Sequence, residues 1–117
     1  MADVNSVILG GNITYSDLSY TPNGLPVLNF SIANRKNYKD SVTDEWKDIT
    51  SFVRCSVFGQ KAEYFDKKVK VGLPCVVTGE MSVKQYEDKD GTKRSSTTII
   101  VKDVEVFEGR HYKNSEN

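Results

Sequence analysis

The sequence predicts a small all-β domain with one short helix, and three observations support this prediction. Stretches rich in aliphatic, aromatic and threonine residues recur between turn signals, which is typical of short strands rather than of alternating strands and helices. Only one stretch, residues 60–70, has apolar side chains at helical spacing. A chain of 117 residues with 38% hydrophobic residues has enough apolar surface for one compact core. We therefore expect a single domain.

The first two predicted strands cover about residues 6–14 and 27–35. In the first, Val7 and Leu9 lie on the face opposite Ile8, and the pair of glycines at 10 and 11 indicates a bulge or a sharp bend. Residues 20–24 contain Pro-Asn-Gly and form a turn. The second strand alternates between apolar and polar positions, with Leu28, Phe30 and Ile32 toward the core.

The third predicted strand, residues 47–58, has the most informative alternation in the chain. The polar segment that precedes it, residues 37–47, has no apolar period, and we expect it to be a long mobile connection. One face of the strand carries Ile49, Val53, Cys55 and Val57. The other face carries Thr50, Phe52, Arg54, Ser56 and Phe58.

The remaining elements complete a recognisable order. A helix is expected over residues 60–70, with Ala62, Phe65 and Val69 at helical spacing and Gly72 near its end. Strands are expected at about 75–87, where Met81 and Val83 face the core, and at about 95–107, with a turn at 88–91 between them. Five strands with a helix between the third and fourth predict an OB-fold, a five-stranded, partly open Greek-key barrel.

Two points about the ends of this domain follow from the same pattern. The first strand could close the barrel or pair across a subunit interface, and the sequence leaves both open. Residues 108–117 are polar, so we expect a disordered tail after a domain that covers residues 1–107.

Composition excludes several classes of function. Sixteen acidic residues balance sixteen basic ones, so a charged partner must be met by a local patch. No apolar run has membrane-spanning length and the first five residues lack a signal-peptide pattern, which indicates a cytoplasmic protein. Cys55 and Cys75 form no metal-binding framework, so no disulfide, zinc or other cofactor is expected. The only histidine, His111, lies in the tail, and we expect no enzyme.

The outward face of the third strand is the main candidate for a binding site, because Phe52 and Phe58 flank Arg54 there. Either a loop or a partner subunit covers these phenylalanines, or they form a platform on which bases stack while the arginine meets phosphates. Trp46 could join this face or pack under the barrel. Tyr38, among basic residues, is either part of a nucleic-acid clamp or of a solvated loop. The candidate nucleic-acid-binding residues are Arg35, Tyr38, Lys39, Lys47, Phe52, Arg54, Phe58, Lys61, Lys84 and Tyr86.

Several motifs resemble the bacterial and phage single-stranded DNA-binding proteins (SSB). They are residues 7–13, 20–24, 29–33, 45–46, 50, 52–55, 57–59, 62–63, 70–72, 77–80 and 86–91, in an order and spacing that match from about residue 4 to residue 107. The resemblance implies an OB-fold, usually a homotetramer, that coats single-stranded DNA without sequence preference during replication, recombination and repair, and has no catalytic activity. It places base-stacking aromatics at Tyr38, Phe52, Phe58 and Tyr86 and phosphate contacts at Arg54 and Lys84.

The chain departs from the family pattern in two places. Gln60, followed by Lys61, stands where the family often has a basic residue, so one phosphate contact is expected to be moved or lost. The acidic tip ending in Pro-Phe, which recruits replication and repair proteins in this family, has no counterpart in residues 112–117. This favours a binding core without a recruiting arm. A phage-encoded, mobile-element-encoded or accessory paralogue that acts in the bacterial cytosol or nucleoid would fit this pattern, although a truncated chain would look the same.

Two other functions stay open at this point. One is an OB-fold module that binds protein in a replication or primosome complex, and the other is an RNA-binding OB domain, because the sequence has no feature that reads the 2′-hydroxyl.

Overall fold

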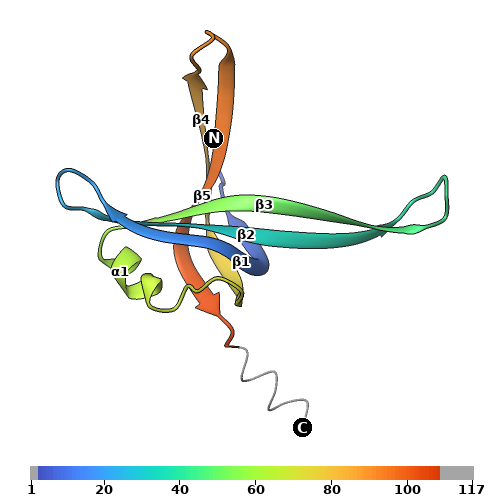
Figure 1. Ribbon diagram of the computed structural model, residues 1–117, viewed down its shortest axis with the longest axis horizontal. Coiled ribbons are helices and arrows are strands. Elements are labelled where there is room, and N and C mark those ends of the chain that lie inside the picture. The colour runs from blue at the N-terminus through green and yellow to red at the C-terminus, as the bar shows by residue number, and fades with distance from the viewer. Residues whose placement is uncertain (1–2, 109–117) are drawn as a thin grey trace.

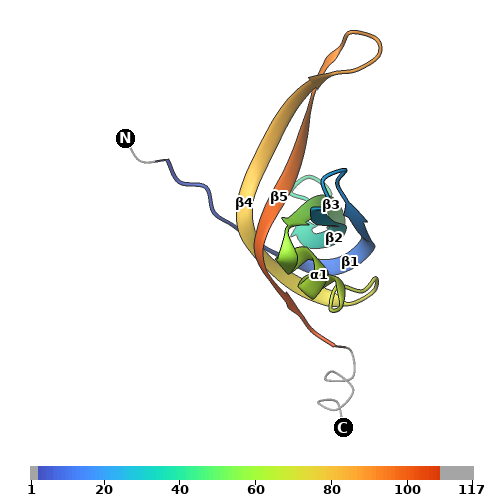
Figure 2. The same cartoon turned by 90° about the vertical axis from the view of Figure 1, so that its left-hand side faces the viewer.

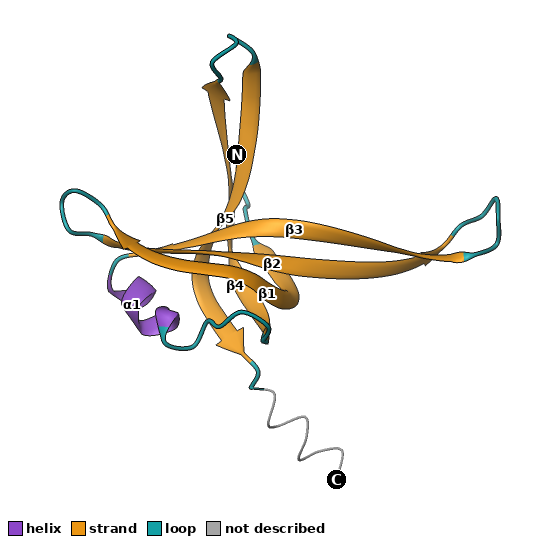
Figure 3. Cartoon of the chain, viewed as in Figure 1, coloured by secondary structure: helices purple, strands orange, loops and turns teal. Residues whose placement is uncertain are grey.

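The computed structural model describes residues 3–108, so the expected tail and His111 lie outside the described residues except for Glu108. Five strands and one helix follow one another in the predicted order (Figures 1 and 3). In residues 3–108 no helix is long and apolar enough to cross a membrane. The elements are β1 (Val7–Tyr20), β2 (Pro26–Lys39), β3 (Trp46–Phe58), α1 (Gln60–Asp66), β4 (Pro74–Glu87) and β5 (Lys93–Val106).

The strands form a closed barrel in the order β1-β2-β3-β5-β4. β1 is shared, because its first half pairs with β4 and its second half pairs with β2, both antiparallel. A parallel pairing between β3 and β5 closes the other side. The first strand therefore closes the barrel within the chain, which decides between the two alternatives left open by the sequence.

Gly11 comes directly before Asn12, the residue at which β1 passes from β4 to β2. A Cβ atom on Gly11 would lie 2.3 Å from the carbonyl oxygen of Ala33 and 2.6 Å from Cγ2 of Ile32. The predicted bend is thus a close approach of β1 to β2, which only glycine permits. The bulge itself lies three residues further along the strand, at Thr14, where the register with β2 shifts.

The core fills the barrel and is closed at one end by α1, whose Ala62 and Phe65 are buried. The helix is shorter than predicted, but Val69 is still buried in the turn that follows, where its N–H donates to the Phe65 carbonyl at 2.8 Å. The predicted core positions on β2 and β3 are confirmed except for Ile49, which is exposed. The buried apolar residues are Ile13, Leu28, Phe30, Ile32, Cys55, Val57, Ala62, Phe65, Val69, Cys75, Val77, Ile99, Val101 and Val104.

Two hairpins extend beyond this barrel, and both correct the sequence analysis. β2 and β3 stay paired out to Lys39 opposite Trp46, so only residues 40–45 form a turn and the expected long mobile connection is wrong (Figure 1). The hairpin has no apolar period because, beyond the barrel, both of its faces meet solvent and backbone pairing holds it together. Met81 and Val83 were predicted to face the core and are instead exposed, because the β4–β5 hairpin also rises away from the barrel (Figure 2).

The turn of the β2–β3 hairpin is ordered by Asp40. Its carboxylate accepts the backbone N–H of Val42 at 2.8 Å and of Thr43 at 3.3 Å. The same carboxylate pairs with Lys47 at 2.9 Å, and this bond is the main reason that the pKa of Asp40 lies below its ordinary value. The hairpin is therefore a structured arm rather than a loose loop.

Candidate nucleic-acid interface

The outer face of β3 carries the aromatic and basic residues that the alternation predicted. Phe52, Arg54 and Phe58 share one face, opposite the buried Cys55 and Val57. Phe52 is 70% exposed and Phe58 is 49% exposed. Within the described residues no loop covers these rings, which removes one of the two structural explanations for them.

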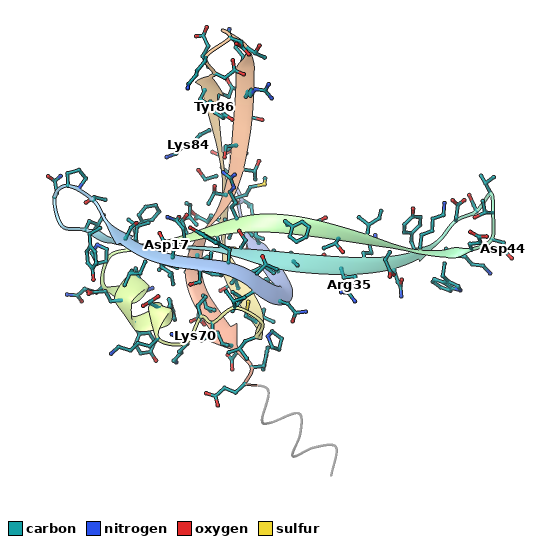
Figure 4. All side chains as sticks on the ribbon, in the orientation of Figure 1. Asp17, Arg35, Asp44, Lys70, Lys84 and Tyr86 are labelled. Atoms are coloured by element: carbon teal, nitrogen blue, oxygen red, sulfur yellow. The ribbon has the colours of Figure 1, made fainter. Side chains whose placement is uncertain are left out.

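The β4–β5 hairpin brings a further aromatic residue to this face. Phe52, Arg54 and Tyr86 line one hollow of about 370 Å³, together with β5 residues 95–97. Figure 4 shows Tyr86 and Lys84 on this hairpin, above the barrel. Two aromatic residues that lie more than thirty positions apart in the sequence thus meet at one site.

A second hollow, of about 540 Å³, adjoins the first along the outer face. It is lined by Tyr15 of β1, Ser31 of β2, Arg54 of β3 and Thr98 of β5, among others. These four residues form one row across the sheet, since each is the register partner of the next. Arg54 lines both hollows, so we treat them as one feature and call it the outer groove.

Tyr15 is the member of the outer groove that the sequence analysis missed. Continuing the alternation from Val7 and Leu9 would turn Tyr15 toward the core. The register instead passes from Ile13 opposite Ile32 directly to Tyr15 opposite Ser31, so the intervening residue is extra and the tyrosine emerges on the outer face. No signal in a single sequence locates such a bulge.

Apart from Lys61, the predicted basic residues fall into two groups. Lys39 pairs with Asp44 at 3.2 Å and Lys47 pairs with Asp40 at 2.9 Å, so acidic residues of the hairpin turn already hold both lysines. In residues 3–108, Arg35, Arg54 and Lys84 have no acidic side chain within 4.0 Å. An incoming anion therefore meets these three cations without competition from a carboxylate.

Other predicted residues lie outside the outer groove. Lys61 donates to the carbonyl oxygen of Lys102 at 3.4 Å. Phe58 lies six residues along β3 from Phe52, about 20 Å away. Tyr38 faces the opposite side of the β2–β3 hairpin from Phe52, because its register partner is Lys47. Trp46 shares the Phe52 face and is 70% exposed at the far end of the hairpin, so it does not pack under the barrel.

One further cation was not predicted. Arg94 lies directly opposite Tyr86 across the hairpin and bonds Asp88 at 2.6 Å. That hydrogen bond is the main reason that the pKa of Asp88 is lowered. The position of Arg94 opposite Tyr86 depends on the register of the β4–β5 hairpin, which the structure supplies.

The two cysteines are free thiols and both are buried. Burial raises the pKa of Cys55 to about 12 and that of Cys75 to about 11, so both stay protonated near neutral pH. Among the described residues no group of three or more histidine, cysteine or acidic side chains is placed to hold a metal ion.

Comparison with known proteins agrees with this geometry. The profile of the single-strand binding protein family matches residues 4–107. A single-stranded DNA-binding protein of Borreliella burgdorferi is 39% identical over 109 residues, which cover 92% of this chain and 72% of that protein. Single-stranded DNA-binding protein 2 of Streptomyces coelicolor is 34% identical over 98 residues, which cover 83% of this chain and 49% of that protein.

Solved structures share the fold. The chain superposes with a TM-score of 0.82 on a structure described as the Plasmodium falciparum SSB complex with ssDNA, at 22% identity and with 92% of this chain and 98% of that one covered. A deletion mutant of the Thermus aquaticus single-stranded DNA binding protein gives a TM-score of 0.77 at 28% identity, with 92% of this chain and 52% of that one covered. The predicted OB-fold is therefore confirmed, and the chain belongs to the single-strand binding protein family.

Proposed function

We propose that this chain binds and coats single-stranded DNA without sequence preference, using the outer groove. The observation that carries the proposal is the meeting of exposed Phe52 and Tyr86 at one hollow beside Arg54. Aromatic faces accept any base, at ~1 to 3 kcal/mol each, because every base has a π-face. An arginine with no acidic partner supplies the charge that a phosphate needs.

Each predicted residue has a role in this proposal. Phe52 and Tyr86 stack bases in the groove, while Arg54, Arg35 and Lys84 meet the backbone. Tyr38, on the hairpin, and Phe58, toward the β1–β2 turn, are further stacking positions for a longer strand. Lys39, Lys47 and Lys61 are secondary phosphate contacts, because each must first leave the oxygen that it now contacts. The groups in the groove bind and orient a strand and have no catalytic role.

Several copies would act together on one strand. A single OB module covers few nucleotides, so a homotetramer would multiply the aromatic surface and the positive charge on a continuous strand. Such a particle would protect single strands in the bacterial cytoplasm during replication, recombination and repair.

The test is a titration of the protein with oligo(dT) of ~35 nucleotides, followed by quenching of Trp46 and tyrosine fluorescence at several salt concentrations. We expect tight binding that weakens as salt rises, no binding to duplex DNA, and a particle of about four times 13.2 kDa by light scattering. Replacing Phe52 and Tyr86 together by alanine should weaken binding strongly, whereas Tyr64→Ala is the matched control.

Tyr64 suits this role because it is 55% exposed, close to the 51% of Tyr86, but lies on α1. Unchanged affinity in a folded double variant would refute the proposed site. Equal competition by oligo(U) of the same length would show that the groove does not prefer DNA over RNA, and absence of binding at low salt would point to a protein partner for the aromatic face.

A further inference from the structure

We infer that Tyr15 is an additional base-stacking residue, so that β1 takes part in binding and the strand crosses the barrel from the β4–β5 hairpin over β3 to β1. This inference rests on the proposed function and deepens it. It assigns a role to a residue that neither the sequence pattern nor the family motifs selected.

The bulge in β1 is the first observation. Without the extra residue, Tyr15 would continue the inward row that contains Ile13 and would compete for space in a filled core. With it, the ring emerges beside Arg54 and stays 53% exposed. Bulges commonly re-aim a side chain next to a functional site, and this one delivers an aromatic face to the groove.

The tyrosine hydroxyl groups provide the second observation. Two other exposed tyrosines have partners for their hydroxyl groups: Tyr20 donates to Glu63 at 2.8 Å, and Tyr64 accepts from Lys68 at 2.8 Å. Within residues 3–108 the hydroxyl of Tyr15 has no hydrogen-bond partner. Its ring is therefore not held by a local polar contact and is available to a ligand.

The spacing across the sheet is the third observation. Tyr15, Ser31 and Arg54 occupy three neighbouring strands in one row, so the backbones of β1 and β3 are about 10 Å apart. Arg54 lines one hollow with Tyr15, which lies across the sheet, and another with Phe52, which lies two residues along β3. A base on each ring therefore leaves the phosphates between them close to the guanidinium group.

Asp17 marks where this track ends. It occupies the next outward position on β1, opposite Asn29, and is exposed (Figure 4). Asn29 is itself occupied, since its side-chain oxygen accepts a hydrogen bond from Ser56 at 2.6 Å. A carboxylate repels phosphate, so the strand does not continue along β1 past Tyr15.

The experiment compares Tyr15→Leu, Tyr15→Phe and the control Tyr64→Leu in oligo(dT) binding by fluorescence anisotropy. We expect Tyr15→Leu to weaken binding by at least about fivefold, the lower end of the range for stacking on one base, and Tyr15→Phe to bind within about twofold of the unaltered protein. Tyr64→Leu should bind normally. Equal binding by Tyr15→Leu and the unaltered protein would overturn the inference while leaving the proposed function in place.

A second measurement does not depend on the folding of any variant. Irradiating the unaltered protein with an oligonucleotide that carries 5-iododeoxyuridine, followed by peptide mapping, should yield a crosslink at Tyr15. Crosslinks confined to Phe52 and Tyr86 would overturn the inference. If the unaltered protein bound no oligo(dT), the proposed function would fail and this inference with it.

Discussion

Replacing Arg54 by glutamine should remove one phosphate contact and reduce the salt dependence of strand binding. Arg54 is exposed on the outer face, lines both hollows of the outer groove and, within the described residues, has no acidic side chain within 4.0 Å. Its guanidinium group is therefore free to replace a counterion on the DNA. Each such contact to a single strand contributes about −0.7 to the slope of log K against log salt.

The magnitude follows from that slope. Without Arg54, the slope should become shallower by about 0.7. When the salt is lowered tenfold, the gain in affinity of the variant should therefore be about five times smaller than that of the unaltered protein. The fold should not change, because the side chain is exposed and holds no partner in the described structure. The assay is oligo(dT) anisotropy between about 0.1 and 1 M salt, with thermal unfolding as the check on folding.

Lys47→Gln provides the matched comparison. Lys47 is also exposed but pairs with Asp40 at 2.9 Å, so binding a phosphate through it means giving up that carboxylate. Its replacement should change the slope by less than half as much as the replacement of Arg54. Equal effects of the two substitutions would refute the reasoning that the hairpin's acidic residues keep their lysines from the DNA.

Three further predictions concern the scaffold. Gly11→Ala should lower the free energy of unfolding in urea by about 1–3 kcal/mol, because its Cβ would lie 2.3 Å from a β2 carbonyl oxygen. In Gly10→Ala the nearest contacts of the Cβ are 3.4 Å or more, so the free energy of unfolding should change by no more than about 1 kcal/mol. Equal losses in the two variants would contradict the close approach. The pKa of Asp88 is lowered, so its bond to Arg94 stabilises the β4–β5 turn fully above the ordinary carboxyl pKa of 3.8, and this stabilisation is lost as the pH falls through the lowered pKa. NMR should show the loss as a pH-dependent change in the amide signals of the turn. The same pH-dependent change in Asp88→Asn would show that another group causes it. Cys55, with a pKa of about 12, should react with a thiol reagent at pH 8 only after unfolding, and rapid reaction of the native protein would show that the barrel opens.

Much of the fold could be predicted from local pattern. Alternation on β3 separated buried Cys55 and Val57 from exposed Phe52, and helical spacing identified Ala62 and Phe65 as core residues. These predictions succeed because burial on one face of a strand or helix leaves a periodic trace in the sequence. The β2–β3 hairpin was missed for the same reason, since an arm solvated on both faces leaves no such trace.

The candidate site was only partly predictable. Phe52, Arg54 and Tyr86 were selected by type and parity, but their meeting at one hollow depends on how β5 pairs with β3 and carries the β4–β5 hairpin past Phe52. The separation of free cations from paired ones required the positions of Asp40 and Asp44, which the hairpin turn sets. Family motifs added roles for residues that match them and could add none for Tyr15.

By itself, then, the sequence determined the order of elements along the chain, the core positions of β2 and β3 within the barrel, and the family of this protein, because each follows from the short-range spacing of residue types. The tertiary structure alone decided that β1 closes the barrel, that the lysines of the hairpin are already paired, and that Tyr15 faces outward. The last point is the clearest, because one extra residue in a strand exchanges its two faces and only the pairing with a neighbouring strand reveals where that residue lies.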